Sequence, residues 1–445
     1  MAMHRSDRNI IKGLDHRNVE ATLVGLKTFM SDSHWVSLSN PYATDIQKLR
    51  RDIKSGNAPH QKELAQYIVA SCLLHCSDGW SYLGRSISAL LRGDPHIARH
   101  LAYYAELRAT KSLLASQGLG VFNHHHFAVT GVNSAVQLSD STGTHDFAWA
   151  SLDYWSSLAG SGALFTELVR PFGINLSQWF ASVGGSAKVA NQAQSWFRQW
   201  GMDLKSFPAD RDARNASSYQ PDGLPEPWQI KASDALAFVT ELWRSLEPSA
   251  NSRFDIIDNH IFRAAVEAYF KGVNGKSRIQ KPAEFDRFIR SVVVPQNLGP
   301  VAEKEIIRFL KWQELPTESL ILSRSRELSK SNDNGAEAVM SRATLLLRTA
   351  SGAASNLFRA VGITEAQVAF WSNNLGRSRG LWESAAPATL SDLWADISLQ
   401  LDEVESFQTK YTKSKQTFYR VGAELHEALV DLGSCERAAI WGASP

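Results

Sequence analysis

Cysteine is scarce in this sequence. The 445 residues include three cysteines, Cys72, Cys76 and Cys435. An odd and low number of cysteines does not build a disulfide framework and is typical of a reducing compartment. The start of the chain, MAMHRSDRN, is polar and lacks the apolar core of a secretion signal. We therefore expect a cytoplasmic protein.

Long apolar runs and an excess of one charge are also missing. No uninterrupted apolar stretch reaches the length that a membrane-spanning helix needs, so we expect no membrane association. The 47 Lys and Arg residues nearly balance the 45 Asp and Glu residues, which leaves a net charge of +2 and no global field for attracting nucleic acid. Glycine loops of the Walker or Rossmann type are absent as well, and we expect no cofactor.

Apolar residues at helical spacing dominate what is present. The 14 Trp and 20 Phe residues supply large side chains for a core, and alternating strand patterns are rare. Helices are expected over the following ranges: Ser77–Leu91, Pro95–Ser116, Lys231–Leu246, Asp258–Lys271 and Ala336–Ala360. The sequence therefore predicts an all-α fold built from multi-helix bundles.

Two features suggest how the chain is divided. The stretch SFPADRDARNASSYQPDGLPEP holds four prolines and many small polar residues, which favour a loop. We predict a helical domain over residues 1–200, a proline-rich connecting loop over 201–230 and a helical domain over 231–445. Thr389 and Asp392 form a start signal for a long C-terminal helix that continues to Leu432 unless Gly422 interrupts it.

Three consecutive histidines, His124 to His126, follow the helix that is expected to stop at Gly118. The segment GLGVFNHHHFAV is predicted to be extended, which places His124 and His126 on one face. With His145 or Asp146 as a third ligand they are candidates for a metal site. The alternative is a loop whose histidines hydrogen-bond to backbone groups. We expect the second arrangement and no bound metal, because nothing completes the ligand set.

Two further clusters of polar residues have a structural and a chemical interpretation. Cys72 and Cys76 lie one helical turn apart with His75 between them, but the surrounding segment is apolar and favours buried, inert thiols. The second cluster is a polar stripe on the helix over Pro95–Ser116 that could carry acid–base groups or form a solvated face with one ion pair; the stripe contains His96, Arg99, His100, Tyr103 and Glu106. We expect the solvated face.

The order of elements here resembles a known family. A helix with the sequence HLAYYAELRATKSLLASQGLG, a glycine stop, a short extended piece with histidine and a helix beginning near Thr144 are similar to the layout of HEPN helical domains. The likeness covers roughly residues 61–160. It implies a compact helical bundle of the kind common in prokaryotic toxin–antitoxin and antiviral systems. Active members are ribonucleases that carry an arginine followed, after four to six residues, by a histidine.

No such pair occurs within the resembling region, but two occur elsewhere. Arg253 and His260 stand in RFDIIDNH, and Arg420 and His426 stand in RVGAELH. In such a pair the histidine would move a proton to or from the reacting oxygen and the arginine would stabilise the charge on the phosphorane. These four residues are the candidate catalytic groups. Two matches are also what chance produces in a chain with 13 histidines.

The sequence thus supports two hypotheses about function. The first is a component of a prokaryotic antiviral or toxin-like system that cuts RNA without a metal. The second is a non-catalytic helical adaptor that binds a partner protein. Expected partners are RNA under the first hypothesis, and a partner protein or a second copy of the chain under the second.

Overall fold

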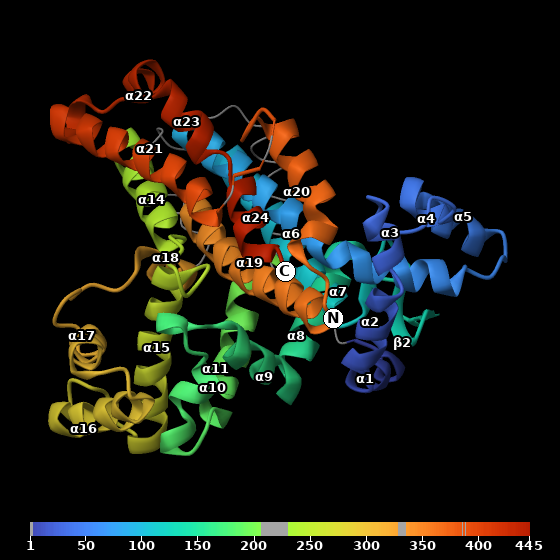
Figure 1. Ribbon diagram of the computed structural model, residues 1–445, viewed down its shortest axis with the longest axis horizontal. Helices are drawn as coiled ribbons and strands as arrows, with labels where there is room; N and C mark the ends of the chain where they lie inside the picture. Colours follow the sequence, from blue (N-terminus) through green and yellow to red (C-terminus); the bar gives the residue numbers. More distant parts are fainter. Residues whose placement is uncertain (1–2, 206–229, 328–334, 385, 388) are drawn as a thin grey trace.

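The computed structural model describes residues 3–205, 230–327, 335–384, 386–387 and 389–445, and these form a three-armed helical protein. Long helices occupy the centre of Figure 1. One arm holds the N-terminal helices (blue), one holds α16 and α17 (yellow) and one holds α21 to α23 (red). The all-α prediction is confirmed, since helices dominate and one small sheet accompanies them in the described part of the chain. None of the described helices combines the length and apolar character needed to span a membrane.

The helices of the N-terminal half have the following bounds: α1 Arg5–Lys12, α2 His16–Val24, α3 Lys27–Ser31, α4 Pro41–Thr44, α5 Gln47–Lys54, α6 Gln61–Leu91, α7 Pro95–Ser116, α8 Thr144–Ser156, α9 Ala159–Leu168, η1 Pro171–Gly173, α10 Leu176–Trp179, η2 Ala181–Val183, α11 Ala187–Trp200 and α12 Met202–Lys205. Those of the C-terminal half are α14 Ala232–Ser245, α15 Asp255–Asn274, α16 Pro282–Val293, η3 Val294–Gln296, α17 Pro300–Leu310, α18 Leu320–Ser325, α19 Gly335–Ala360, α20 Glu365–Arg379, α21 Leu390–Lys410, η4 Lys413–Lys415, α22 Phe418–Glu424, α23 His426–Leu432 and α24 Glu436–Ala443.

Three long helices, α6, α7 and α19, form the core, and α24 packs against α6 and α19. Glycines on α6 allow close approach. A Cβ at Gly79 would lie 2.5 Å from the Leu347 side chain of α19, and a Cβ at Gly84 would lie 2.1 Å from the carbonyl oxygen of Gly433. Helices from both sides of the predicted 201–230 connection therefore share one core. Residues 206–229 of that connection lie outside the described residues, and its beginning contains the short helix α12.

The signals that delimit α7 act as expected. The side chain of Asp94 accepts a hydrogen bond from the Ile97 amide at 3.0 Å, and Pro95 occupies the first helical position. Gly118 follows the helix with a φ of +83°, a conformation that a glycine adopts without strain. The predicted bounds, Pro95–Ser116, are those observed.

A three-stranded antiparallel sheet follows α7, in the order β1-β2-β3. Its strands are Leu119–Val121, His126–Gly131 and Ser134–Gln137. The predicted extended segment is thus confirmed for β1 and β2 but not for His124, whose φ of +62° places it in the turn between them. Strand alternation therefore does not align His124 with His126.

The predicted helix from Thr389 to Leu432 is wrong as one continuous element. Thr389 and Asp392 form the expected capping box, but α21 ends at Lys410 and two short helices follow it. Gly422 lies inside α22 and does not interrupt it. The helix expected to begin near Thr144 is α8, and Thr144 is its first residue, after Gly143.

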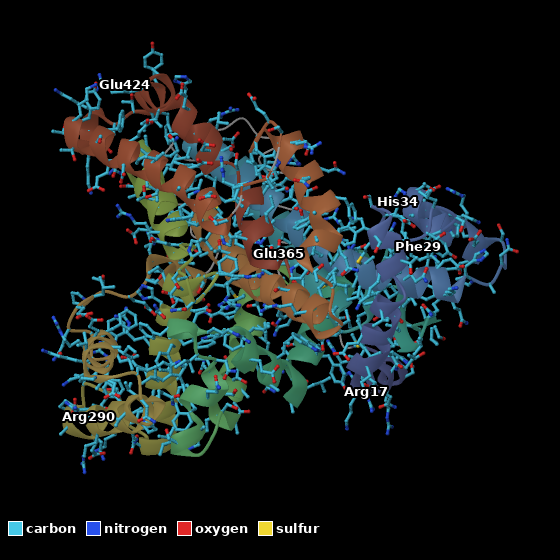
Figure 2. All side chains as sticks on the ribbon, viewed as in Figure 1. Arg17, Phe29, His34, Arg290, Glu365 and Glu424 are labelled. Atoms are coloured by element: carbon cyan, nitrogen blue, oxygen red, sulfur yellow. The ribbon has the colours of Figure 1, made fainter. Side chains whose placement is uncertain are left out.

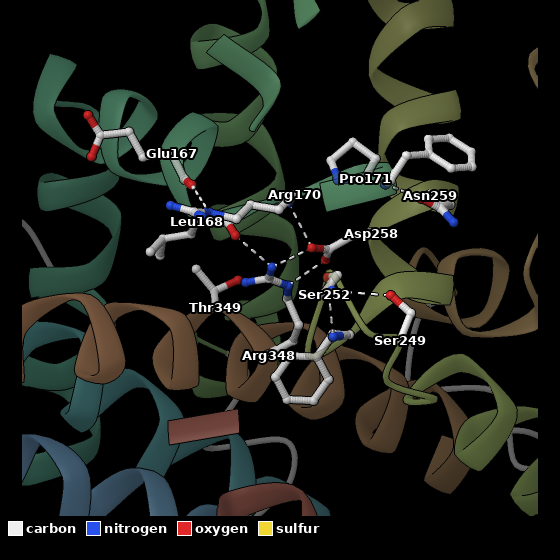
Figure 3. Close-up of polar contacts among 12 residues, drawn as sticks. Glu167, Leu168, Arg170, Pro171, Ser249, Ser252, Asp258, Asn259, Arg348 and Thr349 are labelled. Atoms are coloured by element: carbon white, nitrogen blue, oxygen red, sulfur yellow. Dashed lines mark hydrogen bonds and ion pairs between the residues drawn. The ribbon is translucent and has the colours of Figure 1, made fainter. Parts of the chain in front are cut away.

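A buried ion pair joins α15 to α19 (Figure 3). Arg348 donates two hydrogen bonds of 2.6 Å to the Asp258 carboxylate, and a third of 2.7 Å to the carbonyl oxygen of Leu168. Asp258 also accepts from the Arg170 amide at 2.8 Å, and its side chain is fully buried. The neighbouring Asn259 accepts from the Phe172 amide at 2.9 Å. Helix α15 thereby holds both α19 and the segment that follows α9.

We predict that Arg348→Ala lowers the free energy of unfolding by about 3–5 kcal/mol, because it leaves the Asp258 carboxylate buried without its cation. Urea unfolding measures this loss. Arg290→Ala is the matched control, since Arg290 lies at the periphery (Figure 2) in an exposed pair with Asp286, and should change the stability by less than about 1 kcal/mol. Similar small losses in both variants would contradict the role assigned to the buried pair.

Candidate functional site

A cavity of about 290 Å³ opens beside the core, between α5, α6, α7 and the β1–β2 turn. Its side chains are mostly basic or aromatic. We call it the basic pocket and define it by Arg50, Tyr67, His75, Arg108, Lys111, Phe122 and His125. All of these except Arg50 lie within residues 61–160.

The helix pair α6 and α7 sets the positions of the central groups. Arg108 and Lys111 stand three residues apart on α7, so their side chains lie on neighbouring turns of one face. Arg108 Nη1 lies 2.9 Å from Nδ1 of His75 on α6 and 3.3 Å from a carboxylate oxygen of Asp78. Asp78 is about half exposed and does not line the pocket. The pocket is therefore lined by cations with an acid only at its margin.

The pKa of Lys111 is strongly shifted. Its side chain is largely buried, and among the described residues it makes no ion pair with a carboxylate. Burial first and the charge of Arg108 second lower the pKa of Lys111 to about 7, and the charge of Asp78 offsets only part of this shift. Lys111 thus exchanges its proton near neutral pH, and an anion placed beside it would favour the charged form.

His75 is held in one tautomer. Burial lowers the pKa of His75 well below 6.5, with Lys111 and Arg108 adding to the effect, so the ring is neutral. Because Arg108 is a donor only, Nδ1 of His75 accepts the hydrogen bond and its proton sits on Nε2. His75 therefore offers an N–H donor in addition to the two cations.

Arg50 and His125 complete the pocket near solvent. Arg50 is exposed on α5, and burial followed by the charges of His124 and Arg50 lowers the pKa of His125. The arrangement can stabilise a multiply charged oxyanion such as a phosphate, because several donors and cations converge where water is partly excluded. With Lys111 near its midpoint, the pocket also holds a base suited to neutral pH.

The structure does not join Arg253 and His260 into one site. The guanidinium of Arg253 donates to the carbonyl oxygens of Ser444 and Pro445 and to the Ser355 hydroxyl. Nδ1 of His260 instead lies 3.2 Å from Nη2 of Arg263. His260 lines a different cavity, of about 430 Å³, beside α11 and α15. Burial lowers the pKa of His260 to about 4.

Arg420 and His426 also have separate surroundings. Arg420 stacks over the ring of Tyr411 at 4.4 Å and donates to the carbonyl oxygen of Lys415 at 3.0 Å. His426 begins the next helix, α23, and its side chain is 72% exposed beside Glu427. Neither residue lines one of the cavities described here.

The three histidines weighed as metal ligands contact other groups. Nδ1 of His124 lies 2.8 Å from the carbonyl oxygen of Ser141, and Nε2 of His126 lies 3.0 Å from that of Thr142. Nδ1 of His145 is hydrogen-bonded to the Tyr103 hydroxyl. In the described ranges, no three His, Cys, Asp or Glu side chains come close enough together to hold a metal ion.

The remaining two clusters have different outcomes. Cys72 and Cys76 are buried, as expected, and burial raises the pKa of each thiol to about 12. The polar stripe on α7 is only partly the solvated face that was predicted, since Tyr103 and Glu106 are buried.

Sequence reasoning missed Arg108 and Lys111 as functional residues. A signal was available, since Lys111 interrupts an otherwise small and apolar segment, RATKSLLAS. It carried little weight because a lysine stem also snorkels from an apolar helix face to solvent. Only the position of α6 decides that this lysine is enclosed.

We predict that the purified, untagged protein contains no stoichiometric metal bound through His124 and His126, because both rings already hydrogen-bond to carbonyl oxygens. Elemental analysis of the wild type and of a His124→Ala, His126→Ala double variant tests this. One zinc per chain that disappears in the double variant would overturn the prediction.

We predict a second, pH-dependent effect of His126, whose ring stacks on Phe147 at 3.6 Å and whose pKa is lowered to about 4 by burial. The unfolded chain gains this proton first, so the stabilising contribution is complete above about pH 6.5 and is lost as the pH falls towards 4. The loss attributable to His126 should be about 2–3 kcal/mol near pH 4.5.

Urea unfolding at a series of pH values measures it. The free energy of unfolding of His126→Phe should decrease less steeply with falling pH than that of the wild type. A remaining pH dependence is expected from His75 and His260, whose pKa values are also lowered. His34→Phe, at an exposed position on the N-terminal arm (Figure 2), is the control and should keep the wild-type slope. An unchanged slope in His126→Phe would contradict the assignment.

No family model matches this chain, and neither a curated protein nor a solved structure gives a significant match.

Proposed function

We propose that this chain binds the phosphate groups of RNA in the basic pocket and cleaves RNA there without a metal ion. The observation that carries the proposal is the enclosure of Lys111 beside Arg108 and His75 with no acid lining the pocket. Three donors of this kind suit a phosphodiester better than a neutral ligand. The choice of RNA, and of an antiviral or toxin-like setting, rests on the resemblance of residues 61–160 to HEPN domains.

The chemistry follows from the state of each group. The neutral amine of Lys111 takes the proton of the ribose 2′-hydroxyl as its oxygen attacks phosphorus. Arg108 and the Nε2 proton of His75 stabilise the charge on the phosphorane oxygens. The leaving 5′-oxygen takes a proton from water at the pocket mouth, which gives a 2′,3′-cyclic phosphate and a 5′-hydroxyl end.

The mechanism proposed for the basic pocket differs from the one expected for the Arg253/His260 and Arg420/His426 pairs. In those pairs an arginine and a histidine from one local segment supply both functions. In the basic pocket the base and the charge stabiliser lie on α7 and a further donor lies on α6. Both schemes need no metal, and they make different predictions for single substitutions.

We predict that Lys111→Gln and Arg108→Ala each lower the rate of RNA cleavage by about a hundredfold or more. The assay uses full-length protein, end-labelled RNA and excess chelator. The wild-type kcat/KM, which reports the base of the free enzyme, should rise with pH and level off above about 7 as Lys111 loses its proton.

Lys276→Gln, at an exposed position outside the pocket, is the matched control and should keep the wild-type rate. Thermal unfolding of each variant verifies that the fold is retained. If His260→Ala or His426→Ala abolishes cleavage and Lys111→Gln does not, the sequence-derived pairs carry the activity and the proposal is wrong. If the wild type neither binds nor cuts RNA, the adaptor hypothesis takes its place.

A further inference from the structure

The basic pocket has two chemically different parts at different heights along α6. Tyr67 and His75 are eight positions apart on that helix, a distance of about 12 Å along its axis. The cations Arg108 and Lys111 gather near His75. The aromatic part is made by Tyr67 and Phe122, whose ring centroids are 5.9 Å apart.

The aromatic part is held in place by the sheet. Strand β1 lies so close to α6 that a Cβ on Gly120 would come within 2.6 Å of the Ile68 side chain. This approach places Phe122 against Tyr67, and the Phe122 ring also packs edge-on against the buried Phe127 at 6.3 Å. The aromatic surface is therefore formed before any ligand binds, which lowers the entropic cost of binding.

Tyr67 is open to the pocket while most of its ring is buried. Burial raises the pKa of its hydroxyl, so the ring is neutral at physiological pH. The amide side chains of Gln47 and Asn123 line the same cavity and can exchange hydrogen bonds with a polar heterocycle. Such a combination of an aromatic surface with amides is suited to a nucleobase.

We infer that the basic pocket receives a single nucleotide, with its phosphate at Arg108 and Lys111 and its base against Tyr67 and Phe122. The inference names the ligand class of the site and rests on the proposed function. The volume of about 290 Å³ lies near the lower end of the range of about 300–1,000 Å³ for small-molecule pockets, so it suits one nucleotide and not a duplex. A free mononucleotide and one nucleotide of an RNA strand share this chemistry.

Calorimetric titration of the full-length protein tests the inference with adenosine 5′-monophosphate, ribose 5-phosphate and adenosine. The complete nucleotide should bind about five- to a hundredfold more tightly than ribose 5-phosphate, the range expected for stacking of one base. Tyr67→Ala should remove that advantage and leave ribose 5-phosphate binding unchanged. Lys111→Gln should weaken both phosphates and leave any adenosine binding unchanged.

Tyr419→Ala is the matched aromatic control, because Tyr419 is 87% exposed on α22, outside the pocket. It should bind all three ligands as the wild type does. A short oligoribonucleotide with a 5′-phosphate and 2′-O-methyl riboses, which the proposed reaction cannot cut, separates the two sources, since tighter binding of the strand than of the mononucleotide identifies RNA. Tighter binding of the mononucleotide than of the strand identifies the free nucleotide as the ligand. Either result supports a nucleotide site if Tyr67→Ala weakens the binding.

The outcomes separate this inference from the function on which it rests. Equal binding of the nucleotide and ribose 5-phosphate, unaffected by Tyr67→Ala, overturns the nucleotide site and leaves phosphate recognition by Lys111 standing. Nucleotide binding that needs both Tyr67 and Lys111, in a protein that never cuts RNA, supports the inference and contradicts only the cleavage. Failure of every phosphate ligand to bind contradicts both.

Discussion

The buried ion pair between Asp258 and Arg348 joins two helices of the C-terminal half, and its hydrogen bonds to the backbone of Leu168 and Arg170 tie both helices to the N-terminal half. Arg348 lies on α19, which packs along α6 and α7, and Asp258 lies on α15. Both charges are buried, so each depends on the other and on the backbone groups of residues 168 and 170 for compensation. A fault in this pair would therefore affect the placement of α19, and with it the helix pair that carries the basic pocket.

In the basic pocket, unlike in the core, a buried basic group lacks an ion-pair partner among the residues that line it. Asp258 accepts hydrogen bonds from the Arg348 guanidinium and from a backbone amide. Lys111, in contrast, is enclosed beside the cation of Arg108, and the nearby carboxylate of Asp78 remains half exposed. Burying a cation in this way is costly unless a ligand supplies the missing negative charge. In the core an arginine is paired with a carboxylate, whereas the pocket lysine lies beside another cation, and this contrast is the physical basis for assigning structure to the first and binding to the second.

The candidate site was only partly predictable from the sequence. Residue types suited to metal-independent chemistry on phosphates, histidine with arginine, were expected, but local spacing selected Arg253, His260, Arg420 and His426. In the structure, Arg253 donates hydrogen bonds to the carbonyl oxygens of Ser444 and Pro445, and the side chain of His426 is exposed. The signal for Lys111, a lysine within a small and apolar segment, was too weak to select it, because a sequence does not record which helix lies against a given face.

The sequence by itself determined the helical class and the ends of α7, because periodicity, the Asp94 cap and the Gly118 stop act within a few residues of each other. It also determined that the thiols of Cys72 and Cys76 would be buried. Tertiary structure alone decided the break after Lys410 and the turn at His124. It also decided the enclosure of Lys111 between α6 and α7, since desolvation depends on neighbours that are distant along the chain.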